Sequence, residues 1–291
     1  MAKISALELG ATLFTPASNK NLTSILDKKK YTYLRSVVVD FEDGLEYLEY
    51  EKYFNNFNTI LQSLKKVSLF RFIRVRNIAS LKKFLLLKNI QKIDGFILPK
   101  FSLNNCDEYL SLLKDTSFSF MPSIETTELF DISKLLILKD KLLPFKDKIP
   151  CIRFGLEDML KMLSLRTTKE VNVYDMLVPS SVMSNMLSSF KPFSFEVSSG
   201  VYRFFKDDSG FKKDLLRSID EGFCSKTVIH PNQVKLYEEC MKVEQKNFSE
   251  AKKILNSSKV VFSQDSAMSE TLTQSAWATN IVKRGEIYGI A

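Results

Sequence analysis

The residues best placed for chemistry are two carboxylates that follow short apolar runs. The segment C-I-R-F-G-L-E-D passes from a strand-like run into a helix-like one, and Asp158 stands at that junction beside Glu157. The segment F-M-P-S-I-E leaves Glu125 in the same kind of position. In barrels of alternating strands and helices, the ends of the strands face the active site. We therefore expect Glu125 and Asp158 to approach one another.

Two converging carboxylates repel each other unless a proton or a metal ion lies between them. Their oxygen atoms suit a hard cation such as Mg²⁺. The alternative is that both side chains are solvated acids in the first turns of helices, where the helix dipole favours negative charge.

Composition excludes several other kinds of site. Among the 291 residues are four scattered cysteines, without C-x-x-C spacing, and one histidine, His230. A zinc site, a disulfide framework and a Ser-His-Asp triad are therefore not indicated. The net charge of +8 fits either a solvated surface or attraction of an anionic ligand. Neither a basic tail nor a nucleic-acid motif appears, so we expect no nucleic-acid partner.

The same sequence contains no apolar window long enough for a membrane span and no apolar signal-peptide core at its start. We therefore expect a cytoplasmic protein with no membrane partner.

Apolar runs that end at clear breaks alternate with helical patterns along the chain. A parallel sheet covered by helices produces this alternation. The expected strands are 9–14, 36–41, 68–75, 95–98, the runs before Glu125 and Gly155, 192–197 and 227–229. Eight such units predict a (β/α)₈ TIM-type barrel over residues 1–232. An open doubly wound sheet is the alternative, although no G-x-G-x-x-G or P-loop follows any strand.

A C-terminal extension, residues 233–291, follows the predicted barrel. We expect helices over 233–255 and 270–284, separated by V-V-F-S-Q-D-S. The second helix carries an apolar stripe of Leu272, Ala276, Trp277 and Ile281. Because such a stripe outside a complete barrel needs a surface to cover it, we expect the extension to form a subunit contact.

The order of the motifs at the strand ends resembles the citrate lyase β-subunit-like group of the HpcH/HpaI aldolase family. The motifs are L-F-T-P (13–16), V-V-V-D-F-E-D (37–43), I-R-V-R-N (73–77), G-F-I-L-P-K (95–100), S-I-E-T (123–126), F-G-L-E-D (154–158), G-V-Y (200–202) and G-F-C-S-K-T-V-I-H-P-N-Q-V (222–234). Each motif is weak alone, but their shared order covers nearly the whole chain.

The resemblance implies a Mg²⁺-dependent carbon–carbon bond lyase, or a synthase, for small carboxylic acids, often as acyl thioesters. It implies Glu125 and Asp158 as metal ligands, with Glu125 also lining the substrate site. Arg74 corresponds to the arginine that binds a substrate oxygen, with Arg76 as the alternative if the register is shifted by two. Asp40, Glu42 and Asp43 correspond to the acidic cluster of the pocket, of which one is expected to cap a helix.

Departures from the family pattern affect other parts of the site. Relatives place an aspartate in an M-x-D motif that reaches a neighbouring subunit, whereas this chain has Glu270 in M-S-E. The resemblance thus implies a homo-oligomer, a trimer or a multiple of one, with Glu270 as an acid supplied in trans. Ser198 and Ser199 replace the usual I-D pair, which leaves open whether the acyl carrier is coenzyme A or a carrier protein.

Some roles stay open at the level of sequence. Lys100 could belong to the site or to a structural salt bridge, and His230 is expected to be structural rather than a base. Other enolate chemistry, such as thioester hydrolysis after condensation, is a second enzymatic interpretation. A catalytically inactive barrel that assembles with partner proteins is the alternative outside enzymes.

Overall fold

The computed structural model describes residues 4–257, 261–264 and 267–291. Its strands β1 to β8 form a closed barrel in chain order, and each strand pairs in parallel with its neighbours. The strands are β1 (Ala11–Pro16), β2 (Ser36–Asp40), β3 (Phe70–Arg74), β4 (Gly95–Leu98), β5 (Ser119–Ile124), β6 (Ile152–Phe154), β7 (Val197–Ser199) and β8 (Ser225–Val228). The predicted (β/α)₈ barrel is confirmed.

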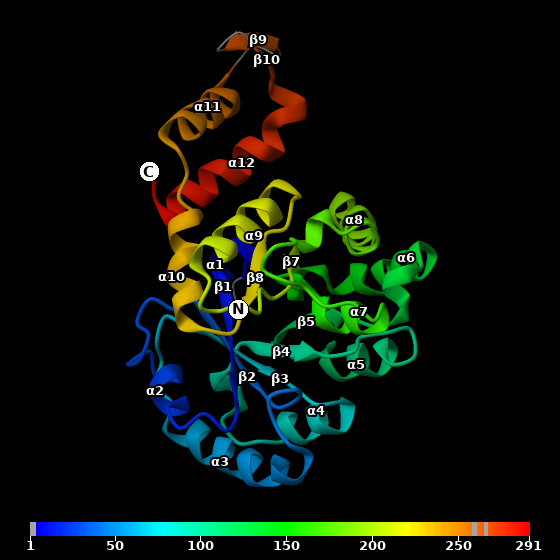
Figure 1. The fold of residues 1–291 in the computed structure, drawn as a ribbon. Helices are drawn as coiled ribbons and strands as arrows, with labels where there is room; N and C mark the ends of the chain where they lie inside the picture. Colours follow the sequence, from blue (N-terminus) through cyan, green and yellow to red (C-terminus); the bar gives the residue numbers. More distant parts are fainter. Residues whose placement is uncertain (1–3, 258–260, 265–266) are drawn as a thin grey trace. The chain divides into compact units, whose positions relative to one another are not determined.

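Helices surround this ring of strands, as Figure 1 shows. They are α2 (Leu22–Leu26), α3 (Tyr50–Ser63), α4 (Ile78–Leu85), α5 (Cys106–Leu113), α6 (Ile132–Leu142), α7 (Leu156–Met162), α8 (Leu177–Phe190) and α9 (Asp208–Asp220). Helix α10 (Pro231–Cys240) follows β8. Each strand is short and almost wholly buried, as expected for a parallel sheet covered by helices.

A short helix, α1 (Ala6–Leu9), precedes β1 and is fixed by a capping box between Ser5 and Glu8. Its Ala6 and Leu9 belong to one apolar cluster with inward-facing strand residues. Those strand residues are Val38, Phe72, Ile97, Met121 and Cys151. The lower part of the barrel interior is therefore filled by apolar side chains, as is usual for this fold.

The seventh strand lies later in the chain than the predicted range 192–197, which is wrong. The strand is β7 (Val197–Ser199), whereas Lys191–Phe193 forms a short 3₁₀ helix with Pro192 in its first turn. Proline suits a first helical turn because its missing N–H would have no partner there. The apolar residues Pro192 and Phe193 therefore end a helical segment instead of beginning a strand.

Contacts divide the chain into two compact units, of which the first ends at Lys235 and the second begins at Leu236. The predicted boundary after residue 232 lies close to this division, while the roles assigned to the two parts stay predictions. In the second unit, α11 (Gln245–Asn256) packs on α12 (Thr271–Tyr288) through Ala251, Ile254 and Ala278. Strands β9 (Val261–Gln264) and β10 (Ala267–Glu270) form an antiparallel pair between these helices in the chain.

The helix predicted over 233–255 is interrupted, because α10 ends at Cys240 and α11 begins at Gln245. Arg284 donates to the carbonyl oxygens of Cys240 and Met241, at 2.9 and 2.7 Å. Val243 forms a parallel bridge with Ile290. These long-range contacts leave no trace in a local hydrophobic pattern. Val260, in the expected V-V-F run, lies outside the described residues.

Candidate active site

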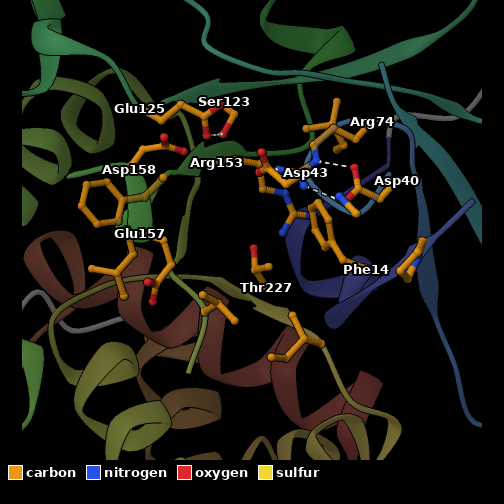
Figure 2. Close-up of a pocket in the computed structure, with 18 residues that line it drawn as sticks. Phe14, Asp40, Asp43, Arg74, Ser123, Glu125, Arg153, Glu157, Asp158 and Thr227 are labelled. Atoms are coloured by element: carbon orange, nitrogen blue, oxygen red, sulfur yellow. Dashed lines mark hydrogen bonds and ion pairs between the residues drawn. The ribbon is translucent and has the colours of Figure 1, made fainter. Parts of the chain in front are cut away.

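A pocket of about 390 Å³ lies at the carboxyl ends of the barrel strands (Figure 2). Its lining comes from most of the strand ends, as the barrel geometry requires. It includes Phe14 and Pro16 from β1, Asp40 from β2, Asp43, Arg74 from β3, Ser123 and Glu125, Arg153 from β6, Glu157 and Asp158 from α7, and Thr227 from β8. The site thus combines several carboxylates and two arginines around a space large enough for a small substrate.

Glu125 follows β5, and its carboxylate is held at both oxygen atoms. The backbone N–H of Lys100 donates to Oε1 at 2.7 Å, and the Ser123 hydroxyl donates to Oε2 at 2.6 Å. Burial raises the pKa of Glu125, whereas these two hydrogen bonds lower it in part. The two hydrogen bonds orient the carboxylate in a buried position.

Gly155 allows Glu125 to occupy this position. A Cβ atom at residue 155 would lie 2.1 Å from Cβ of Glu125 and 2.7 Å from its Oε2 atom. The glycine that breaks the sequence pattern after β6 therefore has a local reason, because any side chain there would displace the carboxylate.

Lys100 places its ammonium group among three carboxylates. Its Nζ atom lies 3.1 Å from Oε1 of Glu42, 3.9 Å from Oε1 of Glu125 and 3.8 Å from Oδ1 of Asp158. Glu125 and Asp158 therefore converge on one cationic position, as the sequence predicts. The lysine side chain is half exposed, so it can move without unfolding the barrel.

Arg74, on the other side of the pocket, is bound by the acidic cluster after β2. Its Nε and Nη2 atoms form a two-pronged contact with Asp40, at 2.7 and 2.6 Å. Its Nη1 atom lies 3.1 Å from both Glu42 and Asp43. Burial disfavours the charged guanidinium, but hydrogen bonding and charge from Asp40, with Glu42 and Asp43, raise the pKa of Arg74 overall.

The cluster also fixes the loop that carries it, because Asp40 accepts hydrogen bonds from the backbone N–H groups of Glu42 and Gly44. Asp40 thus caps this loop rather than the helix that follows.

Glu42 lies against Arg74 and Lys100, outside the residues that line the pocket. Its buried Oε2 atom lies 3.1 Å from Nη1 of Arg74 as an ion pair, but it accepts no hydrogen bond from the described residues. Burial raises the pKa of Glu42 to about 7, although Arg74 and Lys100 oppose the increase.

This raised pKa predicts how stability depends on pH. Native Glu42 keeps its proton up to about pH 7, whereas the unfolded chain loses it near pH 4.5. The unfolded state therefore binds fewer protons between these values, and this group lowers stability as the pH rises. We expect Glu42→Gln to gain stability relative to the natural chain between pH 4.5 and 7, by at most about 3 kcal/mol. Urea unfolding in EDTA measures the difference, and a pH-independent difference would contradict the assignment.

Arg76, the alternative to Arg74, does not line the pocket. It donates to the carbonyl oxygens of Phe41 and Leu45, at 3.2 and 2.7 Å. His230 is exposed and stacks on Phe205, with ring centroids 5.2 Å apart. Glu270, in the second unit, accepts a hydrogen bond from Thr273 at 2.9 Å, and its catalytic role in trans stays a prediction.

The sequence prediction did not include Arg153, which comes from the middle of β6 and is only 2% exposed. Its Nη2 atom donates to the Thr12 hydroxyl across the barrel at 2.7 Å. Its Nε and Nη1 atoms have no hydrogen-bond partner among the described residues. The sequence did offer one clue. Arg153 is a single cation in an otherwise apolar strand, and it is two residues from Cys151, so both side chains face the barrel interior.

Comparison with known proteins assigns the chain to a family. A family model for a carbon–carbon bond lyase of the TIM-barrel fold matches residues 3–290. The chain belongs to this carbon–carbon bond lyase family. The match confirms the resemblance drawn from the motifs at the strand ends. No curated protein sequence matched the chain.

Solved structures share the fold of this carbon–carbon bond lyase family member at low sequence identity. CitE from Mycobacterium tuberculosis, in complex with magnesium, acetoacetate and coenzyme A, is 16% identical over 96% of this chain and 100% of its own, with a TM-score of 0.67. A citrate lyase from Burkholderia xenovorans is 14% identical over 97% of this chain and 93% of its own, with a TM-score of 0.74. The citrate lyase β subunit from M. tuberculosis, complexed with oxaloacetate and magnesium, is 16% identical over 80% of this chain and 98% of its own, with a TM-score of 0.58.

No helix in the described part of the chain combines the length and the hydropathy needed to cross a membrane.

Proposed function

We propose that this protein is a Mg²⁺-dependent carbon–carbon bond lyase that acts on a small oxo- or hydroxy-carboxylic acid or its acyl thioester. The observation that supports it best is the convergence of Glu125 and Asp158 on one cationic position, in a pocket that Arg74 also lines. The solved relatives with magnesium and small oxo-acids support the same assignment. The reaction direction is left open, because cleavage and condensation use the same groups.

The residues present fit Mg²⁺. Within the described residues, no group of three or more acidic, cysteine or histidine side chains forms a complete metal centre. Mg²⁺ does not require one, because it keeps several waters and binds through one or two carboxylates together with substrate oxygens. Glu125 and Asp158 would supply these carboxylates. Lys100, half exposed, would have to turn its ammonium away from them.

Cleavage next to a carbonyl leaves an enolate, and a bound Mg²⁺ would supply a Lewis acid for that negative charge, worth several kcal/mol. Arg74 would add a fixed positive charge at the pocket wall, preorganised by Asp40. Glu42 contacts Arg74 and Lys100 without lining the pocket, so it would act on the substrate through these two cations. Asp43 lines the pocket and is the exposed member of the acidic cluster.

Titration of Mg²⁺ into the purified protein, followed by thermal unfolding, tests this proposal. We expect Mg²⁺ to raise the melting temperature, and a 2-oxo acid to tighten the apparent Mg²⁺ affinity because both would share the pocket. Turnover assays complete the test, with oxaloacetate alone for cleavage and with oxaloacetate plus an acyl thioester for condensation. A protein that responds to neither Mg²⁺ nor oxo-acid would instead fit an inactive barrel that assembles with partner proteins.

The homo-oligomer stays a prediction that the second unit makes testable. In that unit Leu272 and Trp277 on α12 are 75% and 42% exposed, whereas Ile281 packs on its apolar cluster. We expect light scattering at micromolar concentration to show a trimer or a multiple of one, in which Glu270 reaches a neighbouring chain. Leu272→Glu should weaken that assembly, while Asn280→Glu, at an exposed position of the same helix outside the apolar stripe, serves as the control. A monomer would remove the basis for an acid in trans.

A further inference from the structure

A charged side chain deep in the barrel lacks a countercharge within the described part of the chain. Arg153 is 2% exposed, and no carboxylate of the described residues lies within 4 Å of its guanidinium nitrogens. Among the described residues, its side chain donates only from Nη2, to the Thr12 hydroxyl at 2.7 Å and to the Met121 sulfur at 3.3 Å. Buried charges are normally paired, because removal from water without a partner is costly.

The comparison with other buried cations in this chain shows how unusual this is. Arg74 is surrounded by Asp40, Glu42 and Asp43. Lys226, only 1% exposed, lies 2.6 Å from Asp214. Arg71, 4% exposed, donates to the carbonyl oxygens of Leu26 and Lys65. Each of these three side chains binds carboxylate or carbonyl oxygens of the chain. In Arg153, by contrast, Nε and Nη1 have no hydrogen-bond acceptor among the described residues.

Arg153 lies at the wall of the pocket, and its Nε and Nη1 donors, which have no partner among the described residues, are themselves buried. Arg153 lines the pocket, and Figure 2 shows it between the Glu125 and Asp158 side and the Arg74 side in that view. The Phe14 ring packs against its guanidinium, with Cζ 5.9 Å from the ring centroid. The Thr227 hydroxyl faces the same space (Figure 2). A guanidinium can bind a carboxylate through two parallel hydrogen bonds, and Arg153 would have to turn its buried donors into the pocket to do so.

We propose that Arg153 binds a carboxylate group of the substrate at the barrel axis. Arg74 is less suited to this contact because its Nε and Nη2 atoms already bind Asp40. The proposal deepens the proposed lyase function by placing the substrate's anionic end, while the reacting carbonyl lies toward Glu125 and Asp158. It predicts selection for oxo-acids that carry a free carboxylate over their neutral amides.

Calorimetric titration of pyruvate and its neutral analogue pyruvamide tests the proposal, with Mg²⁺ and again with EDTA. We expect the natural chain to bind pyruvate at least tenfold more tightly than pyruvamide. In Arg153→Gln that preference should disappear while Mg²⁺ affinity stays unchanged. Arg76→Gln, which removes an arginine outside the pocket, is the matched control and should bind like the natural chain. Thermal unfolding in EDTA distinguishes a substrate-binding role of Arg153 from a structural one. Arg153→Gln should keep the melting temperature of the natural chain but should no longer be stabilised by pyruvate.

Each other result has a defined meaning. Arg153→Gln that prefers pyruvate as strongly as the natural chain would overturn the proposal, as would a natural chain that binds pyruvate no better than pyruvamide in both conditions. If Arg153→Gln does not fold, Arg153→Lys keeps the charge without the two-pronged geometry, and an undiminished preference there would also overturn it. Arginine-dependent pyruvate binding in EDTA, without Mg²⁺ binding or turnover, would support this inference while contradicting the lyase assignment.

Discussion

Asp158→Asn is expected to lower Mg²⁺ affinity by more than about 100-fold, because loss of a direct ligand should exceed the 10- to 100-fold effect of supporting residues. Turnover should fall with it, since the Lewis acid would be lost. Asp158 is partly exposed and lies in the first turn of α7, so the nearly isosteric change should leave the barrel folded. Calorimetric titration of Mg²⁺, with circular dichroism of the same samples, measures both effects.

Glu157→Gln is the matched control for this change. Glu157 occupies the same first turn of α7 and also lines the pocket, but it is exposed. If the two acids served only the helix dipole, both variants would lose a similar small amount of stability, about 0.3–1 kcal/mol, and neither would affect Mg²⁺. Equal Mg²⁺ affinity in Asp158→Asn and the natural chain would remove Asp158 from the metal site.

Arg74→Lys is expected to lower turnover by about 100-fold while Mg²⁺ affinity changes little, because lysine keeps the charge but loses the fixed fork. Lysine cannot make both contacts that Arg74 makes with Asp40 at 2.7 and 2.6 Å. Loss of one charge-assisted hydrogen bond should also lower the free energy of unfolding by about 1.5–3 kcal/mol. Steady-state kinetics and urea unfolding measure these effects.

Arg76→Lys separates the two arginines of I-R-V-R-N. Arg76 contacts only backbone carbonyl groups of Phe41 and Leu45 among the hydrogen bonds found for its side chain. Its replacement should cost some stability and leave turnover close to that of the natural chain. A larger loss of turnover in Arg76→Lys than in Arg74→Lys would show that the site is assigned to the wrong arginine.

The fold could be predicted where the local pattern and the tertiary structure agree. The β-branched run at 36–41 and the run at 95–98 became β2 and β4 because short, buried, parallel strands need little beyond an apolar sequence. The prediction failed at β7, where Pro192 and Phe193 are apolar but belong to a helical turn. It also failed after Cys240, where contacts from Arg284 and Ile290 interrupt a helix. A local proline turn explains the first failure, and distant contacts explain the second.

The site could be predicted in part for a related reason. Glu125, Asp158 and Arg74 stand at strand ends, and the barrel topology alone brings such positions together. The sequence does not show that Lys100 lies among the acids or that Asp40 holds the fork of Arg74, since both depend on side-chain conformations. Arg153 was missed because a residue inside a strand reads as core, and only strand parity shows that it faces the barrel axis.

The contact between Gly155 and Glu125 has a consequence for protein engineering. A library that diversifies the loop after β6 would usually treat residue 155 as free to vary, since it belongs to neither the acids nor the arginines. Yet a methyl group there would lie 2.1 Å from Cβ of Glu125. Gly155→Ala should therefore displace the Glu125 carboxylate without changing any charge. Redesign of substrate range should keep this glycine constant and vary the opposite wall, around Pro16 and Ile229.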